Sequence, residues 1–119
     1  LETVTIMSNH DIPVLIHVLT DGRDVAPKSA EQYVNKLIKN LPDNAIIATL
    51  MGRYFAMDRD NRWDRIKCAY KAIISGQGEK SETSLNAIRD SYQKNESDEF
   101  IVPTVISSYT GISNGDGLF

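Results

Sequence analysis

Arginine is concentrated in one short stretch of the sequence. Four of the six arginines lie within the thirteen residues 53–65, and this stretch contains no lysine. A planar guanidinium can hold a carboxylate or a phosphate through two parallel hydrogen bonds, which the ammonium of lysine cannot do. The stretch therefore favours binding of a small, multiply charged anion. Three aspartates in the same stretch leave an alternative open, because they could pair with the arginines on a solvated face. These aspartates are Asp58, Asp60 and Asp64.

A second group of charged residues follows an apolar run. Residues 14–19 are apolar apart from His17, and they lead into Arg23 and Asp24 through Gly22. A glycine also precedes Arg53. Glycine lets the backbone and a ligand approach each other closely, so both arginines are placed where a pocket could form.

The surrounding pattern explains how these two groups could meet. Residues 14–19 and 45–51 are mostly apolar on both faces, which is typical of buried parallel strands. Between them, apolar residues recur at helical spacing over residues 29–41, and Ser29 with Gln32 forms a capping box. Strand, helix and strand make a βαβ unit. Because ligands bind at the carboxyl ends of such strands, we expect Arg23, Asp24 and Arg53 at one sheet edge.

The rest of the chain completes a layered α/β domain with a mainly parallel sheet flanked by helices. The spacing predicts helices over residues 1–7, 63–75 and 84–94, and a strand over residues 100–106. Pro103 lacks an N–H group, which predicts an edge or bulged position for that strand. We expect the chain to be truncated at both ends, because it starts within a helical pattern and stops at a strand-like Leu118 and Phe119.

The amino-acid composition excludes several classes of function for this chain. The chain has 119 residues and a net charge of −3, which argues against a nucleic-acid or anionic-membrane binder. A single cysteine, Cys68, excludes an intrachain disulfide and a zinc site built on several cysteines. It favours a reducing, cytoplasmic location. The apolar runs are too short to span a bilayer. His17 is expected on the sheet and His10 in solvent, with neither placed to bind a metal.

Two motifs carry a family resemblance. Residues 20–24 (TDGRD) and 52–65 (GRYFAMDRDNRWDR) resemble the cofactor-independent, or 2,3-bisphosphoglycerate-independent, phosphoglycerate mutases. Further agreement lies in residues 69–70, 91–92, 98–106 and 114–117. The resemblance implies a glycolytic isomerase that interconverts 3-phosphoglycerate and 2-phosphoglycerate through a phosphoserine intermediate. It implies an alkaline-phosphatase-like domain with the serine and two divalent metal ions, usually manganese, and an inserted substrate-binding domain. Residues 1–119 look like the central part of the inserted domain.

The resemblance also implies roles for individual residues. Arg23, Asp24, Arg53 and Arg59 match substrate-binding positions of the family, and Asp24 is the candidate acid/base for the glycerate hydroxyls. The match implies no metal ligand in this chain and no bisphosphoglycerate. The nucleophile, the metal ligands, a substrate histidine and two further arginines would lie outside residues 1–119. We therefore expect the fragment alone to be inactive and to self-associate through uncovered strand edges.

Other classes of function remain open from the residues alone. The same arginine cluster would suit a free-standing small-anion-binding or regulatory module without catalysis. A purely structural insert is a third reading.

Overall fold

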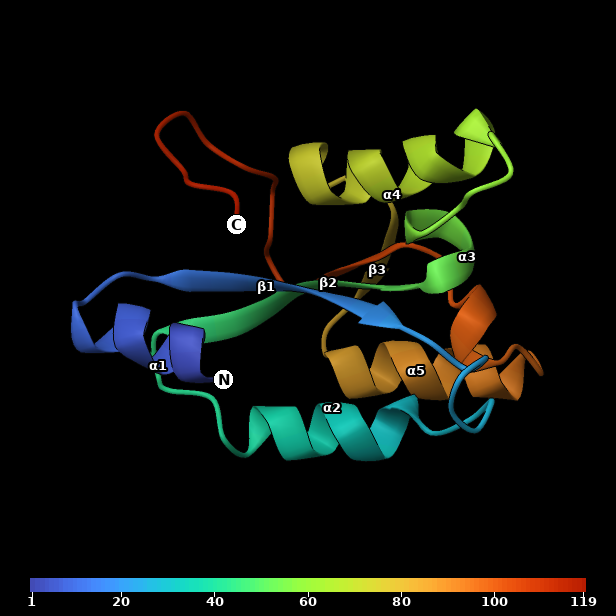
Figure 1. Ribbon diagram of the computed structural model, residues 1–119, viewed down its shortest axis with the longest axis horizontal. Helices are drawn as coiled ribbons and strands as arrows, with labels where there is room; N and C mark the ends of the chain where they lie inside the picture. The colour runs from blue at the N-terminus through green and yellow to red at the C-terminus, as the bar shows by residue number, and fades with distance from the viewer.

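The computed structural model describes residues 1–119 as a four-stranded sheet with helices on both faces (Figure 1). The expected layered α/β class is confirmed. None of the helices has both the length and the apolar character needed to cross a membrane. The strands are β1 (Val14–Thr20), β2 (Ala45–Gly52), β3 (Glu79–Ser81) and β4 (Thr104–Ile106). The helices are α1 (Glu2–Asn9), α2 (Ala30–Ile38), α3 (Arg53–Ala56), α4 (Trp63–Ser75), α5 (Ser84–Gln93) and the short 3-10 helix η1 (Asp98–Phe100).

The βαβ unit is present as the sequence predicts. β1 and β2 are parallel neighbours, and their register runs from Val14 beside Ala45 to Thr20 beside Gly52. α2 connects them and packs on one face of the sheet (Figure 1). This pairing brings the carboxyl ends of both strands to the same edge, so the basis of the site prediction is confirmed.

The prediction for the last strand is wrong in extent and position. The sheet order is β1-β2-β4-β3, so β4 lies inside the sheet, antiparallel to β2 and parallel to β3. Pro103 immediately precedes β4, where its missing N–H removes no ladder bond, and its carbonyl accepts from Glu79 N at 3.2 Å. The expected strand at Leu118 and Phe119 does not form.

Two hydrophobic clusters fill the two faces of the sheet. One joins the sheet to α2 and α5 around the fully buried Leu50 and Ile88. The other joins it to α4 around Met51 and Val105. The helix predicted over Trp63–Ser75 is confirmed, but its buried face is made by the small residues Ala69 and Ala72. Trp63 and Tyr70 of the same helix are exposed.

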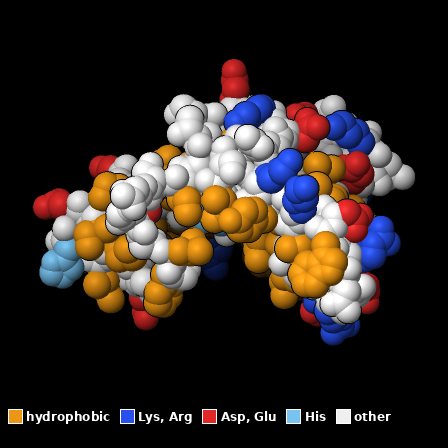
Figure 2. Space-filling model, turned by 90° about the horizontal axis from the view of Figure 1, so that it is seen from above, with side chains coloured by type: hydrophobic (Ala, Val, Ile, Leu, Met, Phe, Trp, Pro, Cys, Tyr) orange, Lys and Arg blue, Asp and Glu red, His pale blue; other side chains and the backbone are white.

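β1 is an edge strand, and one of its faces is only partly covered. Leu15 and Leu19 are exposed, whereas Ile16 and Val18 pack against the cluster on α2 and α5. The expectation that β1 is buried on both faces is therefore wrong for the face that carries the two leucines, because α4 does not cover it. Figure 2 shows hydrophobic side chains gathered on the face seen from above.

Candidate functional site

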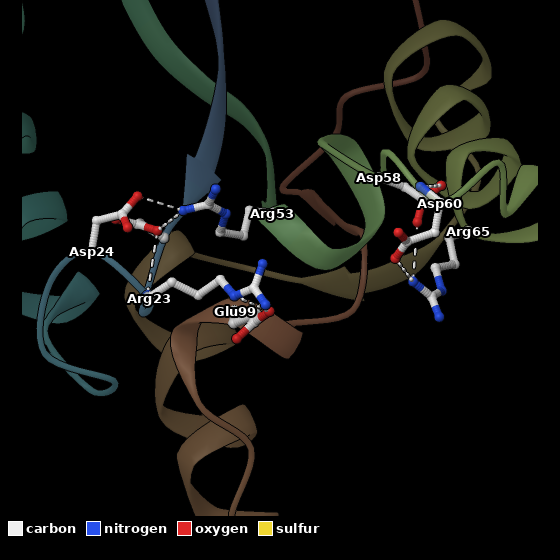
Figure 3. A network of polar contacts seen from close by, with 8 residues as sticks. Arg23, Asp24, Arg53, Asp58, Asp60, Arg65 and Glu99 are labelled. Atoms are coloured by element: carbon white, nitrogen blue, oxygen red, sulfur yellow. Dashed lines mark hydrogen bonds and ion pairs between the residues drawn. The ribbon is translucent and has the colours of Figure 1, made fainter.

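Arg53 links the ends of β1 and β2. It is the first residue of α3, directly after β2, and its Nη1 donates to Asp24 Oδ2 at 2.8 Å and to Asp21 Oδ1 at 2.5 Å (Figure 3). Both aspartates lie in the loop that follows β1. The structure thus brings Asp24 and Arg53 together, as expected from parallel strands that end at one edge.

Asp21 belongs to this site although the sequence reasoning did not select it. Its Oδ1 also accepts from Arg23 N at 3.3 Å, which helps to shape the turn at Gly22, where φ is +70°. The hydrogen bond from Arg53 is the main reason that the pKa of Asp21 lies below its ordinary value. The strand register could have identified Asp21. Thr20 pairs with Gly52, so the residues that follow them, Asp21 and Arg53, are placed side by side.

Arg23 lies at the same edge but is held by a different residue. Its Nε is 3.2 Å from Glu99 Oε1, in an ion pair with the 3-10 helix η1 (Figure 3). The Glu99 side chain is only 17% exposed, whereas that of Arg23 is 54% exposed. Glu99 was not anticipated, because no spacing in the sequence connects η1 to the loop after β1.

Two glycines allow the backbone of η1 to pack closely against this edge of the sheet. A Cβ on Gly52 would fall on the carbonyl of Glu99, and a Cβ on Gly22 would lie 2.9 Å from Glu99 N. Gly52 N also donates to Ile101 O at 2.8 Å. The glycines were predicted to admit a ligand, but here they admit the backbone of η1.

Asp98 fixes η1 from within the core. Its carboxylate is fully buried and accepts from Ser29 N at 2.7 Å, Ala30 N at 2.8 Å and Tyr92 Oη at 2.5 Å. Burial, followed by this hydrogen bond to Asp98, raises the pKa of Tyr92. The capping box predicted for α2 is wrong, because the Ser29 hydroxyl donates to Ala26 O and Asp98 caps the helix instead.

The remaining arginines lie beyond α3. Arg65 pairs with Asp58 at 3.0 Å and packs on the ring of Tyr54, and Arg62 pairs with Asp64 at 3.1 Å. The alternative of paired side chains therefore describes these two arginines. Figure 3 shows the Asp58–Arg65 cluster apart from Arg53. Arg59 is exposed and makes no ion pair within the chain, whereas Arg53 is paired with Asp21 and Asp24.

The site is partly exposed, and its charged groups sum to −1. Two guanidinium groups face three carboxylates, those of Asp21, Asp24 and Glu99. Each arginine retains a pair of adjacent donors that make no hydrogen bond within the chain. In Arg53 these are Nε and Nη2, and in Arg23 they are the two terminal nitrogens. Such pairs can hold carboxylate or phosphate oxygens.

Two other features of the chain do not contribute to this site. His17 Nδ1 lies 2.9 Å from Thr49 Oγ1, and burial lowers the pKa of this histidine, so it is a sheet-face residue as expected. A wide surface depression of about 600 Å³ beside β3 has no hydrophobic lining and contains no arginine. It is lined by Lys80, Ser81, Glu82, Ser107 and Ser108.

Comparison with known proteins agrees with the motifs. The family described as the BPG-independent PGAM N-terminus matches residues 1–119. The 2,3-bisphosphoglycerate-independent phosphoglycerate mutase of Agrobacterium fabrum is 51% identical over 116 residues, which are 98% of this chain and 23% of that protein. The mutase of the same description from Roseobacter denitrificans is 54% identical over 113 residues, covering 95% of this chain and 22% of that protein.

A solved structure shows the same fold. The crystal structure of Leishmania mexicana phosphoglycerate mutase at low cobalt concentration superimposes with a TM-score of 0.77 and 23% identity, over 94% of this chain and 24% of that one. The chain spans less than a quarter of the length of these relatives. Because the family match covers the whole chain, the chain belongs to the BPG-independent phosphoglycerate mutase N-terminus family.

Proposed function

We propose that residues 1–119 form the central part of the substrate-binding domain of a longer, cytoplasmic, glycolytic phosphoglycerate mutase. In this proposal Arg23, Asp24 and Arg53 bind phosphoglycerate at the carboxyl ends of β1 and β2. The observation that supports it most directly is the bond from Arg53 Nη1 to Asp24 Oδ2 at 2.8 Å. It joins two of the proposed substrate residues in a chain whose relatives are named as mutases.

The free donors define what each arginine contributes. Arg53 has its Nε and Nη2 available, which suit a side-on bidentate contact with a carboxylate or phosphate. Arg23 has its two terminal nitrogens available for an end-on contact. Phosphoglycerate carries both kinds of anionic group, so one arginine can hold each end of the molecule while its hydroxyl stays near Asp24.

Asp24 is the proposed acid/base. Its Oδ2 accepts from Arg53, and its Oδ1 makes no hydrogen bond in the chain. A carboxylate oxygen within hydrogen-bond reach of the glycerate hydroxyl can accept or return its proton. Its side chain is 81% exposed, so the substrate can reach it.

Arg59 is a third proposed contact. It is exposed and has no ion-pair partner, so its guanidinium is available to an anion. It lies in the loop between α3 and α4. Its part in binding does not depend on contact with Arg53.

The phosphoryl transfer itself is assigned to the rest of the longer protein. The resemblance implies a serine nucleophile and two divalent ions, usually manganese, in a separate domain. No group of three or more His, Cys, Asp or Glu side chains in this chain is gathered to hold a metal ion. In this proposal residues 1–119 bind and reorient the glycerate.

The test uses the full-length gene product in a coupled mutase assay. We expect turnover with 3-phosphoglycerate, and we expect Arg23→Ala to raise KM. Absence of mutase turnover in the full-length protein, with retained 3-phosphoglycerate binding in calorimetry, would favour the anion-binding or regulatory module instead. Wild-type kinetics in Arg23→Ala and Arg53→Ala would contradict the site.

A further inference from the structure

We propose that Glu99 is a positioning residue, which orients the Arg23 guanidinium so that its two terminal nitrogens face the ligand. This inference rests on the proposed function, because it concerns how one of the substrate arginines is held. It adds a residue from η1, in a part of the chain that the arginine motifs do not include.

The first argument is the difference in burial between the partners. Arg23 is 54% exposed and lies in the loop after β1, so its long side chain would otherwise sample many rotamers. Glu99 is only 17% exposed, so its side chain has less freedom to move. The more rigid partner therefore restricts the more mobile one. Ordering an arginine before the ligand arrives reduces the entropy that binding must overcome.

The second argument is that Glu99 contacts Nε of Arg23 and not a terminal nitrogen. Glu99 Oε1 lies 3.2 Å from Nε of Arg23, at the inner edge of the guanidinium. An ion pair at Nε restricts rotation of the group and leaves the two terminal nitrogens unbonded. These nitrogens form the pair that can bind a phosphate or carboxylate end-on. The contact therefore orients Arg23 without consuming the donors that binding needs.

The third argument is the rigidity of η1 itself. The Asp98 carboxylate accepts two backbone N–H groups at the start of α2, and Asp98 O accepts from Thr20 Oγ1 at 2.6 Å. Gly52 N is bonded to Ile101 O just beyond η1. The backbone of η1 also lies so close to Gly22 and Gly52 that a Cβ at either glycine would clash with it. Glu99 is thus fixed to the same framework that carries Arg53.

A competing role for Glu99 makes the opposite prediction. A carboxylate beside Arg23 could act mainly as an intramolecular competitor for the incoming anion. Removal of its charge would then strengthen binding. A positioning role requires that removal of the contact weakens binding, and because the contact is an ion pair, loss of the Glu99 charge alone should weaken it as well.

The experiment measures KM and kcat for 3-phosphoglycerate in the full-length mutase. We expect Glu99→Ala to raise KM by about two- to fivefold, the scale of one partly exposed ion pair, with kcat unchanged within about twofold. Glu99→Gln should raise KM in the same direction, because it removes the charge that holds Arg23. The matched control is Glu31→Ala, which removes the exposed ion pair with Arg89 on α2 and α5 and should leave both constants unchanged. If Glu99→Ala does not fold, Glu99→Asp keeps the charge but withdraws it by one methylene, and should raise KM in the same way.

A double-mutant cycle separates this inference from the proposed function. In an Arg23→Ala background, Glu99→Ala should cause no further rise in KM, because its effect acts through Arg23. A KM that falls or stays constant in Glu99→Ala, while Arg23→Ala raises it, would overturn the positioning role and keep the site. A KM unchanged by Arg23→Ala would instead overturn the proposed function at that residue.

Discussion

The Arg53 guanidinium is bonded through a single nitrogen, Nη1, to Asp24 at 2.8 Å and also to Asp21. Because Asp24 and Arg53 follow two parallel strands, this contact ties the two strand ends together across the sheet edge. The same arrangement leaves the opposite side of the guanidinium free for an anion. The Arg53 side chain therefore both links the two strand ends and keeps donors for binding an anion. Kinetics on matched variants can separate these two roles.

Arg53→Lys should reduce kcat/KM of the full-length enzyme by about ten- to a hundredfold. Lysine keeps the charge but cannot make the bidentate contact, and a lost charge-assisted hydrogen bond costs about 1.5–3 kcal/mol. Arg62→Lys is the control, because Arg62 pairs only with the exposed Asp64. Steady-state kinetics check both variants. Equal kinetics for the two would remove Arg53 from the site.

Asp24→Asn and Asp21→Asn should differ in which constant they change. Asparagine at position 24 cannot exchange a proton, so kcat should fall about 10²–10⁴-fold with a smaller change in binding. Asp21 holds Arg53 and the backbone N–H of Arg23 but has no proposed part in proton transfer, so Asp21→Asn should act mainly on KM. A normal kcat in Asp24→Asn would make Asp24 a binding residue and exclude the acid/base role.

Tyr92→Phe should lower the free energy of unfolding by about 1–3 kcal/mol, because it leaves Asp98 Oδ1 buried without its hydrogen-bond donor. Urea unfolding of the 119-residue chain, followed by circular dichroism, measures the change. Tyr33→Phe is the control, since Tyr33 is exposed on α2. Equal stability of the two variants would show that the Asp98 hydrogen bond contributes little.

The stability of the chain should fall as the pH is lowered through 6.5, in part because of His17. Burial depresses the pKa of His17 below its ordinary value of 6.5. The unfolded chain therefore binds a proton that the folded chain resists, and the free energy of unfolding decreases with decreasing pH in this window.

His17→Gln should flatten that part of the pH profile, whereas His10→Gln should not, since His10 is exposed in the loop after α1. Urea unfolding at a series of pH values from about 5 to 7.5 spans the ordinary range of histidine titration. Parallel profiles for the wild type and His17→Gln would contradict the prediction.

Local patterns in the sequence determined the framework of the site. Two apolar runs separated by a helical period identify β1, α2 and β2, because hydrophobic periodicity reflects which face of each element is buried. A parallel pair joined by one helix then places Arg23, Asp24 and Arg53 at a common edge. The arginine-rich motif identified the family from residues alone.

Only the tertiary structure decided what holds these side chains. Asp98 caps α2 from 69 residues away, and Glu99 reaches Arg23 across a similar separation. β4 enters the sheet between β2 and β3, so a segment with only three strand residues becomes central. Such contacts leave no periodicity in the sequence, because they depend on how the elements pack and not on the spacing within any one of them. The local sequence predicted an edge position for the strand that contains Pro103 and a cap from Ser29 for α2. Packing places β4 inside the sheet and makes Asp98 the cap instead.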